Sequence, residues 1–141
     1  MKIVGLDLGS KTLGVAVSDP SMTIATKLTT ITFLNNDFEY AIKELFAILK
    51  DVEIETFVLG LPKNMDGSLG FQAQASIRFK EMLEVKFNKP VILWDERLTS
   101  KMAESLMIQA DLSRKKRKTK VDFVAATIIL QSYLDSRKRD L

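Results

Sequence analysis

The sequence predicts an α/β fold with a mixed five-stranded sheet flanked by helices. Three strand-like segments come first, and the turns between them are too short for a crossover, which favours an antiparallel meander. Two later strand-like segments are continuously apolar, as central parallel strands are, and a helical segment separates them. We therefore expect an antiparallel three-strand meander followed by parallel strands, within a single domain over residues 1–141.

Alternation, β-branched residues and turn signals place the elements in order. The expected strands cover residues 2–8, 13–19, 23–33, 56–61 and 90–95. Apolar residues at helical spacing predict helices over about 37–51, 71–87, 100–111 and 120–138. Asn36 or Asp37 can cap the first helix, and Thr99 or Ser100 can cap the third.

The chain contains no cysteine and no histidine. This composition excludes disulfides, thiolate zinc sites, cysteine nucleophiles and Ser-His-Asp machinery. Catalysis would have to use carboxylates, lysine, hydroxyls, backbone amides or a metal ion held by oxygen ligands.

The net charge of +3 hides a split along the chain. Residues 1–113 carry 12 basic and 15 acidic side chains, whereas residues 114–141 carry 9 basic and 3 acidic ones. The densest basic segment is Arg114, Lys115, Lys116, Arg117 and Lys118, and nucleic-acid phosphates are its expected partner. The alternative is a segment that only aids solubility.

No apolar run approaches the roughly 18 residues of a membrane span. The apolar start of the chain is cut short by Asp7, unlike the core of a signal peptide. We therefore expect a cytoplasmic protein without a membrane partner, and the lack of disulfides is normal in that compartment.

Acidic residues stand at the ends of predicted elements. Asp7 closes the first strand, Asp95 and Glu96 close the last, and Asp122 lies in the first turn of the last helix. Adjacent strand residues point to opposite faces, so one of Asp95 and Glu96 would face a site while the other braces a loop or pairs with Arg97. Singly, these acids could be solvated strand ends or helix caps. Together, they predict a site for Mg²⁺ or Mn²⁺ and metal-assisted phosphodiester cleavage.

The loop after residues 56–61 carries possible phosphate donors. Lys63, Asn64 and Ser68 follow Pro62, and Asp66-Gly67 is a strong turn pair. The loop could contact phosphates or could simply be a turn-rich connection.

Four segments occur in an order that resembles a known family: GLDLGSKTLGVAVSD, VLGLPKNMDGSLG, WDERLTS, and the basic segment followed by VDFVAATIILQSYL. They resemble the bacterial YqgF family of pre-ribosomal-RNA nucleases, which are also described as Holliday-junction-resolvase-like. The resemblance implies an RNase H-like fold and trimming of the 5′ end of the 16S rRNA precursor, with branched DNA as the second substrate class.

The same resemblance implies roles for individual residues. Asp7, Glu96 and Asp122 would be the catalytic, metal-binding acids, although Asp95 also matches the second of these positions. Supporting and substrate-binding roles would fall to Gly9, Lys11, Asn64, Arg97 and Thr99. Ser100 replaces a threonine of the family pattern and keeps its hydroxyl.

Three other functions fit parts of the sequence. A resolvase for branched DNA would act as a two-fold dimer, and the sequence leaves the oligomeric state open. The spacing from Asp7 to Gly14 resembles the phosphate motif of actin-like ATPases and sugar kinases, which need two such domains. A non-catalytic RNA-binding module on pre-ribosomal particles would use only the basic segment.

Overall fold

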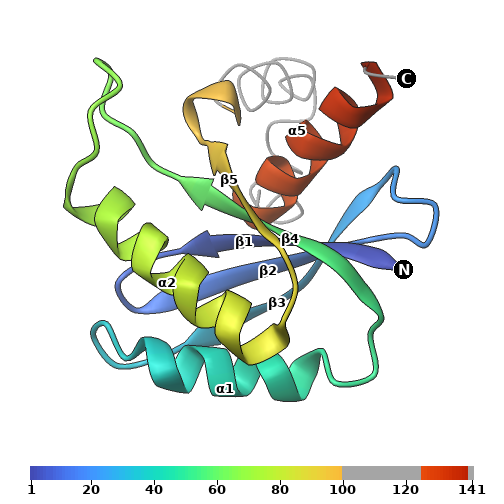
Figure 1. Ribbon diagram of the computed structural model, residues 1–141, viewed down its shortest axis with the longest axis horizontal. Helices are drawn as coiled ribbons and strands as arrows, with labels where there is room; N and C mark the ends of the chain where they lie inside the picture. Colours follow the sequence, from blue (N-terminus) through green and yellow to red (C-terminus); the bar gives the residue numbers. More distant parts are fainter. Residues whose placement is uncertain (100–124, 140–141) are drawn as a thin grey trace, which may run out of the picture.

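The computed structural model describes residues 1–99 and 125–139, and its strands form one mixed sheet (Figure 1). The strands are β1 (Lys2–Leu8), β2 (Thr12–Ser18), β3 (Ala25–Thr32), β4 (Ile54–Leu61) and β5 (Val91–Asp95). Their order across the sheet is β3-β2-β1-β4-β5. β1 and β2 pair antiparallel, as do β2 and β3, whereas β1–β4 and β4–β5 are parallel. The predicted meander followed by parallel strands is confirmed.

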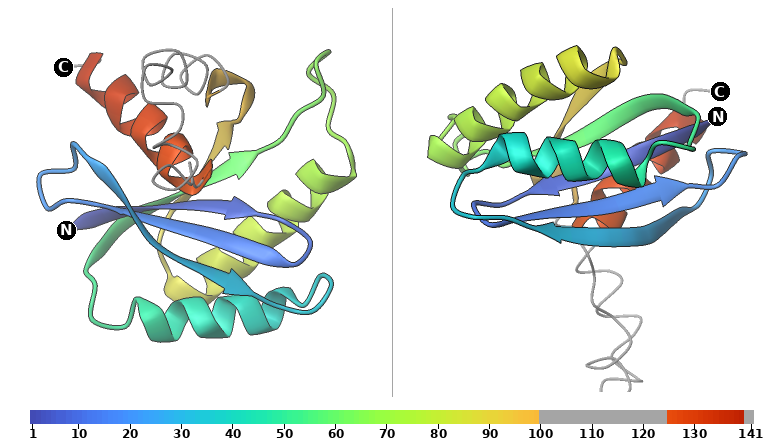
Figure 2. Two further views of the ribbon diagram at one scale, coloured as in Figure 1. Left: turned by 180° about the vertical axis from the view of Figure 1, so that it is seen from behind. Right: turned by 90° about the horizontal axis from the view of Figure 1, so that it is seen from below.

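Helices cover both faces of this sheet. α1 (Phe38–Ile48) and α2 (Phe71–Phe87) lie on one face, and α5 (Ala125–Arg139) lies on the other (Figure 2). Asp37 caps α1, since its Oδ1 accepts a 3.2 Å hydrogen bond from the Tyr40 N–H. Residues 97–99 are already helical, so the predicted cap of the third helix at Thr99 or Ser100 is wrong. The rest of the helix expected over 100–111, and the first residues of the one expected over 120–138, lie outside the described residues. Within the described part, no helix has the length and apolarity needed to cross a membrane.

Strand alternation divides the core into two layers. On β1, Val4, Leu6 and Leu8 pack toward α1 and α2, in the same cluster as Phe79 of α2. Ile3 packs on the opposite side, in a cluster with Leu130 of α5. By the same alternation, Asp7 belongs to the face that α5 covers.

α5 lies very close to the sheet. A Cβ atom on Gly5 of β1 would stand 2.6 Å from Leu130 Cβ and 3.0 Å from the Ala126 carbonyl oxygen, so only glycine allows this approach. Gln131 ties the helix to the sheet edge, because its Oε1 accepts from Ala25 N–H at 2.9 Å and its Nε2 donates to the Thr23 carbonyl at 3.0 Å. The position of α5 over β1 is therefore fixed by both apolar packing and hydrogen bonds.

Candidate active site

Asp7 stands near the carboxyl end of β1, in the middle of the sheet. Its partner in the antiparallel register of β2 is Gly14, which adds no side chain beside the carboxyl group. The Asp7 side chain is half-buried, and this burial raises its pKa above the ordinary 3.8, although a hydrogen bond from Glu96 opposes the rise. A carboxyl group that is hard to ionise thus lies where open α/β sheets place ligands.

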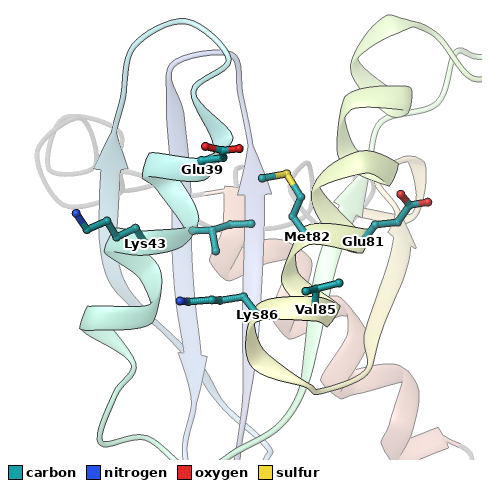
Figure 3. Close-up of a pocket in the computed structure, with 7 residues that line it drawn as sticks. Glu39, Lys43, Glu81, Met82, Val85 and Lys86 are labelled. Atoms are coloured by element: carbon teal, nitrogen blue, oxygen red, sulfur yellow. The ribbon is translucent and has the colours of Figure 1, made fainter.

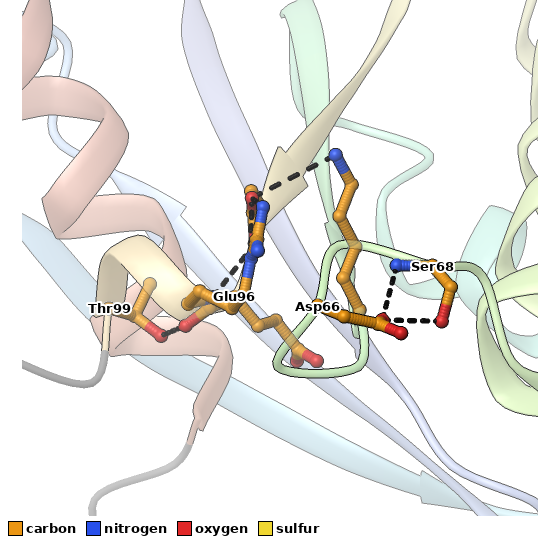
Figure 4. Close-up of polar contacts among 7 residues, drawn as sticks. Asp66, Ser68, Glu96 and Thr99 are labelled. Carbon is orange, nitrogen blue, oxygen red and sulfur yellow. Dashed lines mark hydrogen bonds and ion pairs between the residues drawn. The ribbon is translucent and has the colours of Figure 1, made fainter.

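Glu96 is the first residue after β5, and the turn around it is held by the main chain. Its N–H donates to the Leu61 carbonyl at 3.1 Å. Its carbonyl accepts from the N–H of Thr99 at 3.0 Å and from the Thr99 hydroxyl at 2.6 Å (Figure 4). These bonds fix the direction in which the Glu96 side chain leaves the turn.

The carboxyl groups of Asp7 and Glu96 form a hydrogen-bonded pair, with protonated Glu96 as the donor. The pKa of Glu96 is raised to about 7. Burial is the largest cause, followed by the negative charge of Asp7 and by this hydrogen bond. Two partly desolvated carboxylates in contact repel each other unless a proton or a cation lies between them. All the donors are carboxylate oxygens, which suits Mg²⁺ or Mn²⁺. The pair therefore fits the predicted metal ion.

The third predicted acid, Asp122, lies outside the described residues, as does the basic segment from Arg114 to Lys118. Within residues 1–99 and 125–139, no three acidic side chains are grouped closely enough to hold a metal ion. Of the three predicted acids, the structure thus brings two together, Asp7 and Glu96.

Asp95 has a different set of partners. Its Oδ1 and Oδ2 each accept from Arg97 Nε at 3.1 Å, and Oδ2 also accepts from Arg97 Nη2 at 2.8 Å. The Lys63 ammonium lies 3.8 Å from the same Oδ2. Hydrogen bonding by Arg97 holds the pKa of Asp95 below its ordinary value. Of the two candidates for the second acid, Glu96 lies against Asp7, whereas Asp95 forms ion pairs with Lys63 and Arg97.

The β4–α2 loop runs beside these cations. Asn64 Nδ2 donates to Ser68 Oγ at 3.0 Å. Asp66 Oδ1 accepts from both the N–H and the hydroxyl of Ser68 (Figure 4). A Cβ on Gly67, whose φ is +88°, would lie 3.6 Å from Arg97 Nη1. The Lys63–Asp95 ion pair joins this loop to the end of β5. Lys63 from this loop and Arg97 from the segment after β5 thus meet at the Asp95 carboxylate.

The remaining predicted residues have simpler surroundings. Lys11 is exposed in the β1–β2 turn, where a hydrogen bond from Gly9 N–H to the Thr12 carbonyl at 2.7 Å closes the chain. Gly9 and Lys11 therefore follow directly on the strand that carries Asp7. Thr99 uses its hydroxyl to hold the Glu96 turn, so the structure places it as a support of that turn.

Gly60, which has no predicted role, lies in β4 directly beside the Glu96 carboxyl group. A signal for it was present, because a glycine inside a continuous apolar strand often marks the close approach of another group. The partner could not be identified without the order of the strands.

A groove of about 530 Å³ lies on the other face of the molecule, between α1 and α2 (Figure 3). Ile42, Met82 and Val85 form its apolar part, and four charged side chains stand around them: Glu39, Lys43, Glu81 and Lys86. It contains none of the predicted site residues and is separate from the carboxylate pair.

Comparisons with known proteins show the family to which the chain is similar. A family model described as "RuvX: Holliday junction resolvase" matches residues 1–136. A protein of Geobacillus sp. (strain WCH70) is 52% identical over 138 residues, covering 98% of this chain and 100% of its own. One of Bacillus subtilis (strain 168) is 49% identical over 136 residues, covering 96% and 99%. Both carry the name "Putative pre-16S rRNA nuclease".

A solved structure supports the fold. RuvC of T. thermophilus in complex with a Holliday junction substrate superposes with a TM-score of 0.65 over 99% of this chain and 96% of its own, at 13% identity. At this identity the likeness shows the fold alone, and it confirms the predicted RNase H-like arrangement.

Proposed function

Because the chain belongs to the RuvX family of Holliday junction resolvases, as its resemblance to YqgF proteins predicted, we propose that it is a metal-dependent nuclease that processes the 5′ end of pre-16S rRNA. The curated relatives support the substrate, since two that carry the name of a pre-16S rRNA nuclease are about 50% identical over 96–98% of this chain. The substrate would be met during ribosome assembly, on precursor RNA or pre-ribosomal particles.

The observation that carries the proposal is the contact between Asp7 and Glu96. These two carboxylates would hold Mg²⁺ or Mn²⁺, together with Asp122, which stands three residues before α5 in the sequence. When bound, such an ion supplies a water of lowered pKa and neutralises charge on the phosphate that is cleaved. The Asp7–Glu96 pair would give up its shared proton to take up the ion.

Basic side chains would position the nucleic acid. Arg97, with its guanidinium held by Asp95, can donate to a phosphate from a fixed orientation, and Lys63 adds a second positive charge next to it. Lys11 in the β1–β2 turn and Asn64 in the β4–α2 loop would contact the sugar-phosphate backbone of the nucleic acid. The segment from Arg114 to Lys118 would attract the polyanion over a longer range.

The test is cleavage of a pre-16S rRNA fragment with Mg²⁺ or Mn²⁺ by purified wild type, Asp7→Asn and Asp122→Asn. We expect both variants to fold and to lose cleavage. The matched control is Asp51→Asn, an exposed carboxylate in the turn before β4, which should cleave as the wild type does. If folded Asp7→Asn and Asp122→Asn both cleave the RNA as the wild type does, the proposal is wrong.

Resolution of branched DNA is the second candidate, because the matching family model is described as a Holliday junction resolvase. A side-by-side assay on precursor RNA and a four-way junction separates the two functions. Symmetric cutting of a junction requires two active sites related by a two-fold axis. A monomer that cuts only the RNA would reject this candidate.

A further inference from the structure

Gly60 lies where both Glu96 and α5 approach the sheet closely. A Cβ atom on Gly60 would stand 2.9 Å from Glu96 Oε1 and 2.6 Å from Ile129 Cδ1. Both distances are shorter than real Cβ contacts allow. Any side chain at this position would therefore have to displace Ile129, Glu96 or both.

The register of the sheet explains why this one position matters. β4 lies between β1 and β5, and Leu59 pairs with Leu6 while Gly60 pairs with Trp94. Gly60 and Asp7 are thus the next residues on neighbouring strands. Glu96 follows the strand on the other side of β4, so its side chain has to cross β4 to reach Asp7. The missing side chain of Gly60 leaves the space for that crossing.

We propose that Gly60 is a positioning residue for the metal site. Its bare backbone lets the Glu96 carboxyl lie across β4 against Asp7, and it seats Ile129 of α5, the helix that Asp122 precedes in sequence. The inference rests on the proposed function, since it concerns how that site is assembled. It makes one glycine responsible for the spacing between the second acid and the sheet.

The two contacts of Gly60 can be separated experimentally. Ile129→Val removes the Cδ1 atom and with it the packing collision, so Gly60→Ala in that background tests the Glu96 contact. We compare Gly60→Ala/Ile129→Val with Ile129→Val alone by measuring Mn²⁺ affinity from the EPR signal of free Mn²⁺, and thermal unfolding without metal. We expect the dissociation constant for Mn²⁺ to be about tenfold or more higher in Gly60→Ala/Ile129→Val than in Ile129→Val, because disturbing a group that supports a metal ligand weakens metal binding by at least that factor.

The control glycine is Gly70, where a Cβ would meet only Asn64 atoms, at an ordinary 3.6 Å. Gly70→Ala should leave the Mn²⁺ affinity unchanged. If Gly60→Ala/Ile129→Val loses its cooperative unfolding, Ile129→Ala replaces Ile129→Val in both proteins, which clears more space for the new methyl group. A crystal structure of the metal-free variant should show the Glu96 carboxyl moved away from Asp7.

The outcomes separate the inference from the function it rests on. If the wild type binds no Mn²⁺, the proposed metal site fails and Gly60 has nothing to position. If the wild type binds Mn²⁺ and the variant with alanine at position 60 binds it equally well, the metal site stands and the inference is overturned. A lower unfolding temperature with unchanged Mn²⁺ affinity would likewise overturn it, because that result assigns Gly60 to packing alone.

Discussion

The guanidinium of Arg97 engages both carboxylate oxygens of Asp95, with its shortest contact at 2.8 Å. This pairing occupies Asp95 on one side of the β5 end while the neighbouring Glu96 turns to Asp7 on the other. The two adjacent acids thus have different partners. Asp95 pairs with the guanidinium of Arg97, whereas Glu96 is not used in that ion pair and lies against Asp7.

Exchanging each acid for its amide should separate the roles of the two. Glu96→Gln removes a proposed metal ligand. Loss of a residue that only supports a metal ligand lowers activity by up to about 100-fold, so loss of the ligand itself should lower kcat by more than roughly 100-fold. Asp95→Asn leaves the ligands in place but loosens Arg97, so KM should rise by about three- to tenfold with little change in kcat. Steady-state cleavage kinetics with both variants give the comparison. A large fall in kcat for Asp95→Asn with Glu96→Gln still active would reverse the assignment.

Stability without metal should fall as the pH rises. The pKa of Glu96 is about 7 in the folded protein and ordinarily 4.5, so the folded state holds an extra proton between these values. This contribution is fully present below pH 4.5 and is lost as the pH rises through 7. After allowance for solvent screening, we expect a loss of about 1–2 kcal/mol.

Urea unfolding in EDTA at pH 5 and pH 8 measures this effect. Glu96→Gln should be more stable than the wild type at pH 8, and the difference should shrink at pH 5. The exposed Glu81→Gln serves as the control and should follow the wild type at both pH values. Mg²⁺ should restore stability to the wild type at pH 8 but not to Glu96→Gln. Equal pH dependence in all three proteins would contradict the raised pKa of Glu96 in the half-buried carboxyl pair.

The sequence alone predicted the directions of the strands, because these follow from local patterns and general rules of connection. The order of the strands across the sheet comes from the structure. Short turns dictate the antiparallel meander, and helices between apolar strands dictate the parallel part. The separate directions of Asp95 and Glu96 also follow from alternation. Which of them faces Asp7 does not, since β5 ends at Asp95 and the Glu96 side chain is directed by a turn that Thr99 holds.

The role of Gly60 was beyond sequence reasoning for a different reason. Its role depends on Glu96, 36 positions later, and on Ile129 in α5, the helix that covers the same face of the sheet. Only the order β1-β4-β5 brings these residues to one point. Local patterns identify which residue types can do chemistry, but long-range register decides which of them meet.

Gly67 should be intolerant of most side chains for a reason of backbone conformation. Its φ of +88° lies in the left-handed region, while the nearest neighbour of a new Cβ is Arg97 Nη1 at 3.6 Å, an ordinary van der Waals distance. Gly67→Ala should therefore cost about 1–2 kcal/mol through backbone strain, without a steric clash. Gly67→Asn should cost less, since asparagine tolerates this region better. Urea unfolding of the two variants measures the difference, and equal losses would rule out a backbone origin.

The basic segment should control how strongly nucleic acid binding depends on salt. Each phosphate contact that is lost lowers the slope of log K against log salt by about 0.7–0.9. Changing all five side chains from Arg114 to Lys118 to glutamine should therefore lower the slope by up to about 4. Fluorescence anisotropy with labelled precursor RNA in EDTA measures binding without cleavage. The matched control changes the same number of exposed lysines elsewhere on the chain: Lys27, Lys43, Lys50, Lys86 and Lys89. Both variants have the same net charge, so equal losses of slope would mean that overall charge, and not this segment, attracts the RNA.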